Sequence, residues 1–148
     1  MCGAILFLQA AGKRLKEKDD PMNFKPSTLV FYVEKVEASC AFYTALLGHS
    51  PLRQVPNFAL YALEGNLTLG LRARHDVVPK PEAVAGGSEL AFTVGTRAEL
   101  DELHLDWSHR GWLIVQQPID QPFGYTFTAL DPDGHRLRVM ALNPQPAK

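Results

Sequence analysis

Short apolar segments alternate along this chain with two longer segments of helical periodicity. Residues 37–47 and 97–110 carry apolar side chains at helical spacing, and each segment is followed by a glycine, Gly48 or Gly111, the residue that commonly ends a helix. Segments rich in β-branched and aromatic residues are typical of strands. The predicted strands cover residues 27–33, 58–63, 67–71, 89–94, 112–116, 125–130 and 136–142.

The predicted elements occur in the same order twice. Each half reads as a strand, a helix and then three strands, although the pattern delimits only two strands after the first helix. Val33 and Val94 fall at equivalent places in the two halves, which indicates an internal duplication. Four segments result: an N-terminal extension (1–24), a first module (25–76), a linker rich in proline and glycine (77–87) and a second module (88–148). Neither module is large enough to bury its sheet alone, so we expect the two to pack together.

The first 24 residues contain an apolar stretch at residues 4–8. This stretch is too short to span a bilayer, and its basic neighbours, Lys13, Arg14 and Lys16, follow it, whereas in a signal peptide they precede the apolar core. We expect an extension, such as one amphipathic helix on the protein surface; an interfacial anchor is the alternative.

Composition narrows the range of partners. The 148 residues are 46% hydrophobic and 21% charged, with a formal net charge of -1, which is typical of a globular protein and gives no electrostatic reason to expect nucleic acid or a membrane as partner. The two cysteines, Cys2 and Cys40, do not form a disulfide framework, so we predict a reducing, cytoplasmic location. We expect Cys40 to be a small buried apolar residue.

Two motifs at the ends of the duplicated frame resemble a known superfamily. Val33-Glu34-Lys35-Val36-Glu37-Ala38-Ser39, followed by Phe42-Tyr43 and Leu46-Leu47-Gly48, resembles the first-module signature of the vicinal oxygen chelate proteins, the glyoxalase, bleomycin-resistance and dioxygenase group. Asp131-Pro132-Asp133-Gly134-His135, followed by Leu137 and Val139, resembles their last-hairpin signature. The resemblance covers residues 27–142 and implies an α+β fold of two βαβββ modules, from an internal duplication, that form cupped mixed sheets.

The resemblance also implies four places where the enzymes of this superfamily hold a divalent metal. Here they are filled by Thr28, Glu89, Arg138 and Leu71, or by its neighbour Gly70. Only Glu89 is a candidate metal ligand, and a weak one, because arginine stays protonated and offers no lone pair. We therefore predict no metal and no other cofactor, and we expect Glu89 and Arg138 to form an ion pair inside the cavity; the alternative is that one of them points to solvent.

Aromatic side chains in the strands and in the 123–125 loop are candidates for stacking on a planar ligand. Strand alternation places Thr28, Val30 and Tyr32 on one face, and Gly124 before a strand is expected to let the backbone approach a ligand. The same aromatics are alternatively core residues. The predicted ligand-binding residues are Thr28, Tyr32, Phe58, Leu71, Glu89, Trp112, Phe123, Tyr125, Phe127 and Arg138.

The run from Ile114 through Gln121-Pro122-Phe123-Gly124 to Arg138-Val139 resembles the metal-free bleomycin- and phenazine-resistance type, which are homodimers that sequester an aromatic drug. The leading hypothesis is therefore a non-catalytic homodimer that binds an aromatic small molecule or antibiotic. The alternative is a lyase, isomerase or dioxygenase that uses Ni, Zn, Mn or Fe, for which His135 or a shifted strand register would have to supply further ligands. A third hypothesis is an interaction module with a collapsed cavity.

Overall fold

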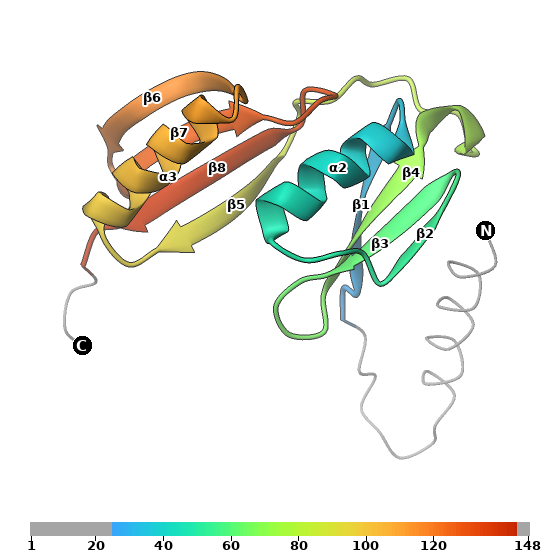
Figure 1. Ribbon diagram of the computed structural model, residues 1–148, viewed down its shortest axis with the longest axis horizontal. Coiled ribbons are helices and arrows are strands. Elements are labelled where there is room, and N and C mark those ends of the chain that lie inside the picture. The colour runs from blue at the N-terminus through green and yellow to red at the C-terminus, as the bar shows by residue number, and fades with distance from the viewer. Residues whose placement is uncertain (1–24, 145–148) are drawn as a thin grey trace, which may run out of the picture.

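The structure is a computed structural model that describes residues 25–144, and it consists of two four-stranded sheets, each with one long helix (Figure 1). In the first half the strands lie in the order β1-β4-β3-β2, with β1 and β4 parallel and the other neighbours antiparallel. Its elements are β1 (Thr28–Val33), α2 (Val36–Leu47), β2 (Arg53–Val55), β3 (Phe58–Ala62) and β4 (Thr68–Ala73).

The second half repeats this topology after a 3-10 turn, η1 (Arg74–Asp76), and the linker. Its strand order is β5-β8-β7-β6, and β5 and β8 are again the parallel pair. Its elements are β5 (Glu89–Val94), α3 (Arg97–His109), β6 (Leu113–Gln121), β7 (Gly124–Leu130) and β8 (Arg136–Leu142). The predicted α+β fold of two duplicated βαβββ modules is confirmed.

Two strands depart from the pattern read along the sequence. The first of the three strands after α2 is β2, which the sequence pattern did not delimit because its three residues, Arg53 to Val55, are too few to show alternation. Strand β6 runs five residues beyond its predicted end, through Pro118 and Asp120, because it is an edge strand whose register shifts on both sides of Gln116. Proline and charged residues are tolerated at such an edge, where one side of the strand has no ladder partner.

Each helix covers one face of its own sheet and leaves the other face open. In β1 the inward residues Phe31 and Val33 are buried, whereas Val30 and Tyr32 are about two-fifths exposed. We call the uncovered faces the first open face (sheet β1-β4-β3-β2) and the second open face (sheet β5-β8-β7-β6). The side chains buried beneath the helices include Phe31, Val33, Tyr43, Tyr61, Leu69, Leu71, Leu100, Trp107, Phe127, Leu137 and Val139.

A turn of the second half, residues 131–135 between β7 and β8, forms hydrogen bonds to the first half. The buried Tyr43 hydroxyl in α2 donates to Asp131 Oδ2 over 2.7 Å, and the other oxygen of Asp131 accepts from the backbone N–H groups of Asp133 and His135. Asp133 in turn accepts from the backbone N–H of Glu34 over 2.8 Å. The carboxylates of this motif thus serve the junction between the halves.

Ring contacts complete the junction. The His135 imidazole stacks on Phe31, with the ring centroids 4.3 Å apart, and its Nε2 lies 3.0 Å from the carbonyl oxygen of Tyr32. Phe42 of α2 contacts Trp112, with centroids 4.5 Å apart. Because these contacts bury apolar rings from both halves, each half supplies part of the other's core.

Within residues 25–144, no helix has both the length and the apolar character needed to cross a membrane. The predicted amphipathic helix or interfacial anchor at residues 1–24 lies outside the described residues.

Candidate functional site

The second open face has an ion pair near its centre. The Nε of Arg138, from β8, donates to both carboxylate oxygens of Glu89, from β5, over 2.9 and 2.8 Å. The Arg138 side chain is 16% exposed and that of Glu89 is 38% exposed, so the guanidinium lies within the face while the carboxylate reaches its rim. The predicted ion pair is confirmed.

Polar side chains from the neighbouring strands hold the same guanidinium. Its Nη1 donates to Gln116 Oε1 over 3.1 Å and to Thr126 Oγ1 over 3.2 Å, and the Thr128 hydroxyl donates to the same Gln116 oxygen. All four strands of the sheet therefore contribute to one network. Within residues 25–144 the Nη2 group of Arg138 makes no hydrogen bond, so its two donors remain for a ligand.

The loop between β6 and β7 places an aromatic ring beside this network. Phe123 is 41% exposed, and its ring centroid lies 5.9 Å from the Arg138 guanidinium carbon. The following Gly124 has a φ of +152°, and a Cβ there would clash with the Ala141 carbonyl oxygen. Close contact with the end of β8 therefore requires glycine here, and the approach of a ligand to this backbone stays a prediction.

Among the described residues, the first open face has no charged side chain at its centre, and the cation of β4, Arg72, pairs with Tyr32 toward the end of that strand. The hydroxyls of Thr28 and Thr68 bond to each other over 2.9 Å, and Val30 and Tyr32 continue the same face of β1. Beside them, the Phe58 ring and the Val30 side chain pack against Gly70. A Cβ at Gly70 would lie 3.2 Å from the Phe58 ring and 3.3 Å from a methyl group of Val30.

Strand pairing gives the equivalent residues of the two halves. Val30 pairs with Gly70 in the first half, as Ala91 pairs with Arg138 in the second. Gly70, and not Leu71, is therefore the counterpart of Arg138. By the same register Thr28 corresponds to Glu89, and the pair Phe58 and Leu60 corresponds to Thr126 and Thr128.

These four places do not fit a divalent metal. Thr28, Gly70 and Arg138 offer no anionic or imidazole ligand, and both oxygens of the one carboxylate, Glu89, are taken by Arg138. The part of the chain that the structure describes contains no group of three or more His, Cys, Asp or Glu side chains able to hold a metal ion. The arrangement instead offers a cation with free donors, hydroxyl groups and exposed rings, which suits a polar, flat organic molecule.

Four predicted ligand-binding residues lie elsewhere. Leu71 and Phe127 have no exposed surface and belong to the core beneath α2 and α3, because alternation turns them to the helix side. Trp112 packs between Phe42 and Trp107 at the junction of the halves. Tyr125 lies on the helix side, where its hydroxyl donates to Asp101. Thr28, Tyr32, Phe58, Phe123, Glu89 and Arg138 lie on or beside the open faces.

The sequence prediction missed Gln116, Thr126 and Thr128. The two threonines are separated by the buried Phe127 and share the face of Arg138, which strand alternation could have shown. Gln116 lies between two register shifts, so its orientation could not be read from the sequence.

The titratable groups of the first half's core are kept neutral by burial. Desolvation raises the pKa of Tyr43 far above its usual range, and the neighbouring Asp131 carboxylate adds to this effect. Burial raises the pKa of Tyr61 to about 12, and it also raises the pKa of Cys40. Cys40 is free and 5% exposed, as expected for a small buried apolar residue.

The chain is similar in sequence and in structure to known proteins. The Phenazine antibiotic resistance protein EhpR of Enterobacter agglomerans is 28% identical over 123 residues, which cover 80% of this chain and 92% of that protein. Protein ATC0852 from Agrobacterium tumefaciens, solved by NMR, is 45% identical, covers 82% of this chain and 99% of its own, and superposes with a TM-score of 0.76.

A more distant structure shows the same fold. A glyoxalase-related enzyme from Fulvimarina pelagi is 20% identical and has a TM-score of 0.73 over 84% of this chain and 92% of its own. The family model described as the Glyoxalase/Bleomycin resistance protein/Dioxygenase superfamily matches residues 25–139. With the duplicated βαβββ topology and its two signature motifs, this match establishes that the chain belongs to the Glyoxalase/Bleomycin resistance protein/Dioxygenase superfamily.

Proposed function

We propose that this protein binds and sequesters a planar aromatic small molecule, such as an antibiotic, without transforming it. The observation that carries the proposal is the network around Arg138. In the enzymes of the superfamily a metal ligand stands at this place, and here it is occupied by a guanidinium that its neighbours hold in position. Sequestration requires tight binding and no reacting group, so the replacement does not impair it.

The surroundings of Arg138 support a flat, polar ligand. Its Nη2 donors are free to bond an acceptor on the ligand, and the exposed Phe123 ring beside them offers a stacking surface. The resemblance to a phenazine antibiotic resistance protein, which covers 92% of that protein, also supports a planar aromatic ligand.

A homodimer is part of the proposal. In one chain both open faces are uncovered, and each carries exposed apolar side chains, Val30 and Tyr32 on the first and Leu113 and Ile119 on the second. A ligand on one open face would be enclosed only if a second copy covered it, because drug-sized ligands are usually buried over most of their surface. We place this dimer in the cytoplasm, where the free Cys40 stays reduced.

The test is calorimetric titration of the full chain with phenazine and with a phenazine carboxylate. We expect saturable binding that Arg138→Gln weakens about tenfold, the equivalent of about 1.4 kcal/mol for one charge-assisted hydrogen bond. The matched control is Arg110→Gln, which removes an exposed arginine that also pairs with an acid, Asp106, and should leave the affinity within about twofold.

Two results would overturn the proposal. One is binding that is equally strong in the wild-type protein and in a folded Arg138→Gln variant. The other is stoichiometric uptake of Ni, Zn, Mn or Fe by the purified protein with turnover of an added substrate, which would favour the metalloenzyme alternative.

A further inference from the structure

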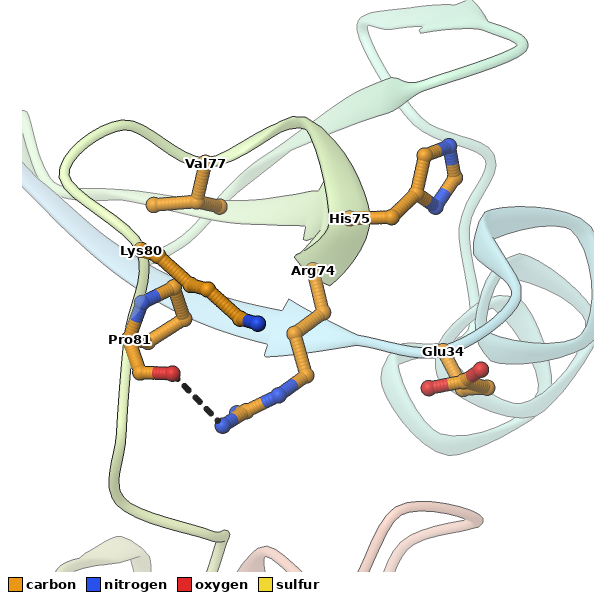
Figure 2. Close-up of a pocket in the computed structure, with 6 residues that line it drawn as sticks. All are labelled: Glu34, Arg74, His75, Val77, Lys80 and Pro81. Carbon is orange, nitrogen blue, oxygen red and sulfur yellow. Dashed lines mark hydrogen bonds between the residues drawn. The ribbon is translucent and has the colours of Figure 1, made fainter.

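We propose a second binding site, separate from the open faces, that takes a small organic anion bearing a carboxylate or phosphate group. The site is a pocket of about 410 Å³ at the point where the first half passes into the linker. Six residues line it: Glu34, Arg74, His75, Val77, Lys80 and Pro81. Figure 2 shows them arising from three segments, which are the end of β1, η1 and the linker.

The argument begins with Arg74, whose side chain is held in place by the linker. Its Nη2 donates to the carbonyl oxygens of Pro81, over 3.2 Å, and Ala83, over 2.7 Å. Within residues 25–144 its Nε and Nη1 make no hydrogen bond, so a positioned guanidinium keeps three N–H donors available. A guanidinium fixed in this way binds an oxyanion without first losing much conformational entropy.

Lys80 brings a second positive charge to the same pocket. Its side chain extends from the linker toward that of Arg74 (Figure 2). Among the described residues neither cation has an acidic partner within ion-pair distance, although Glu34 faces them across the pocket. Among the six lining residues there are two such cations and one carboxylate, and this balance favours an anion over a neutral or cationic ligand.

The remaining walls select an organic anion over a bare inorganic one. Val77 and Pro81 supply apolar surface next to the two charges, and the volume falls in the range that accommodates a drug-sized molecule. Carboxylates and phosphate monoesters share the charged oxygens that Arg74 and Lys80 would bind, and the apolar wall would cover the rest of the molecule.

The test is NMR titration of the isotopically labelled full chain at constant ionic strength with benzoate, phenyl phosphate and inorganic phosphate. We expect saturable shifts of backbone amides in residues 74–83 and at Glu34, with the two organic anions binding more tightly than inorganic phosphate. Lys80→Gln should weaken binding about three- to fivefold, and Glu34→Gln should strengthen it about twofold. Whichever organic anion binds more tightly identifies the preferred head group.

Lys25→Gln is the matched control, because it removes the same charge at the opposite end of β1 and should leave binding unchanged. Arg138→Gln should also leave it unchanged, which separates this pocket from the second open face. The proposal is overturned if no anion gives saturable shifts, if Lys25→Gln and Lys80→Gln weaken binding equally, or if the shifts map to the second open face and disappear in Arg138→Gln.

Discussion

The two halves of this protein have the same strand topology but different chemistry at the equivalent central places of their open faces. In the first half Thr28, Gly70 and Phe58 form a neutral surface with a ring packed over a glycine. At the equivalent places the second half has Glu89, Arg138 and Thr126, which form a charged network. Topology therefore fixes where these side chains point, and the residue type at each of these places decides whether the centre of the face is neutral or charged.

Beneath the helices the contrast between the halves is reversed. The first half has buried Tyr43 and Tyr61, whose hydroxyls bond to Asp131 and to the Cys40 carbonyl. The counterpart of Tyr61 in the second half is Ala129, and the buried rings of that half include Trp107 and Phe127, which contact each other. The first half thus has the more polar core, and it depends on the second half for an acceptor.

Asp131→Ala should have the largest effect, because this residue joins the two halves. The change removes the acceptor of the buried Tyr43 hydroxyl and of two backbone N–H groups, and we expect it to lower the free energy of unfolding by about 3 kcal/mol in urea titrations. Pro132→Ala, at an exposed place in the same turn, is the control and should change stability by less than about 0.5 kcal/mol. A loss below about 1 kcal/mol for Asp131→Ala would mean that the halves are held by ring contacts alone.

High pH should reveal the contribution of the buried Tyr61 in the first half. The pKa of Tyr61 is raised to about 12 in the folded protein, against about 10 for an unfolded tyrosine. Its contribution to stability is therefore complete below pH 10 and is lost as the pH rises toward 12, because the unfolded chain ionises first. We expect stability in urea titrations to fall between pH 10 and 12, with Tyr43 also contributing to the fall, and we expect the fall to be smaller by about 2 kcal/mol in Tyr61→Phe. An identical decline in that variant would contradict this assignment.

Gly70→Ala tests whether crowding by neighbouring side chains excludes a Cβ at Gly70, the counterpart of Arg138 on the first open face. The new methyl group would press on Phe58 and Val30, and we expect a loss of about 1–2 kcal/mol in unfolding free energy. Gly87→Ala, where a Cβ has no neighbour within 4 Å, is the matched control and should be nearly neutral. The double variant Gly70→Ala with Phe58→Leu should recover part of the lost unfolding free energy. No recovery would show that the contact with Phe58 does not cause the loss.

Glu89→Gln should have the smallest effect. The Glu89 carboxylate is 38% exposed, so solvent screens its pairing with Arg138, and we expect less than about 1 kcal/mol of destabilisation. A double-mutant cycle with Arg138→Gln measures the coupling, which should be about 0.5 kcal/mol. A coupling above about 2 kcal/mol would show that the charged network is a main source of stability in the second half.

Several features of the candidate site could be predicted from the sequence. Alternation within β1 and β5 assigned Thr28, Tyr32 and Glu89 to the faces on which they lie, and the residue type of Arg138 argued against a metal at its place. Alternation assigns Phe127 and Tyr125 to the helix side, whereas their aromatic character alone favours contact with a planar ligand.

The remainder depended on contacts between distant segments. Gln116 reaches Arg138 because β6 shifts register twice, and such bulges leave no reliable signal in one sequence. The pocket of Glu34, Arg74 and Lys80 forms only because the linker folds back over η1.

The sequence by itself determined the duplicated βαβββ order, the ends of both long helices and the residue types at the four equivalent places. These follow from periodicity, glycine placement and motifs, which are local properties of a chain. Only the tertiary structure decided that Asp131 and Asp133 join the two halves, that Gly70 is the counterpart of Arg138, and that Leu71 and Phe127 belong to the core. Each of these depends on strand register and on packing between residues far apart in the chain, where a shift of one residue turns every side chain to the opposite face.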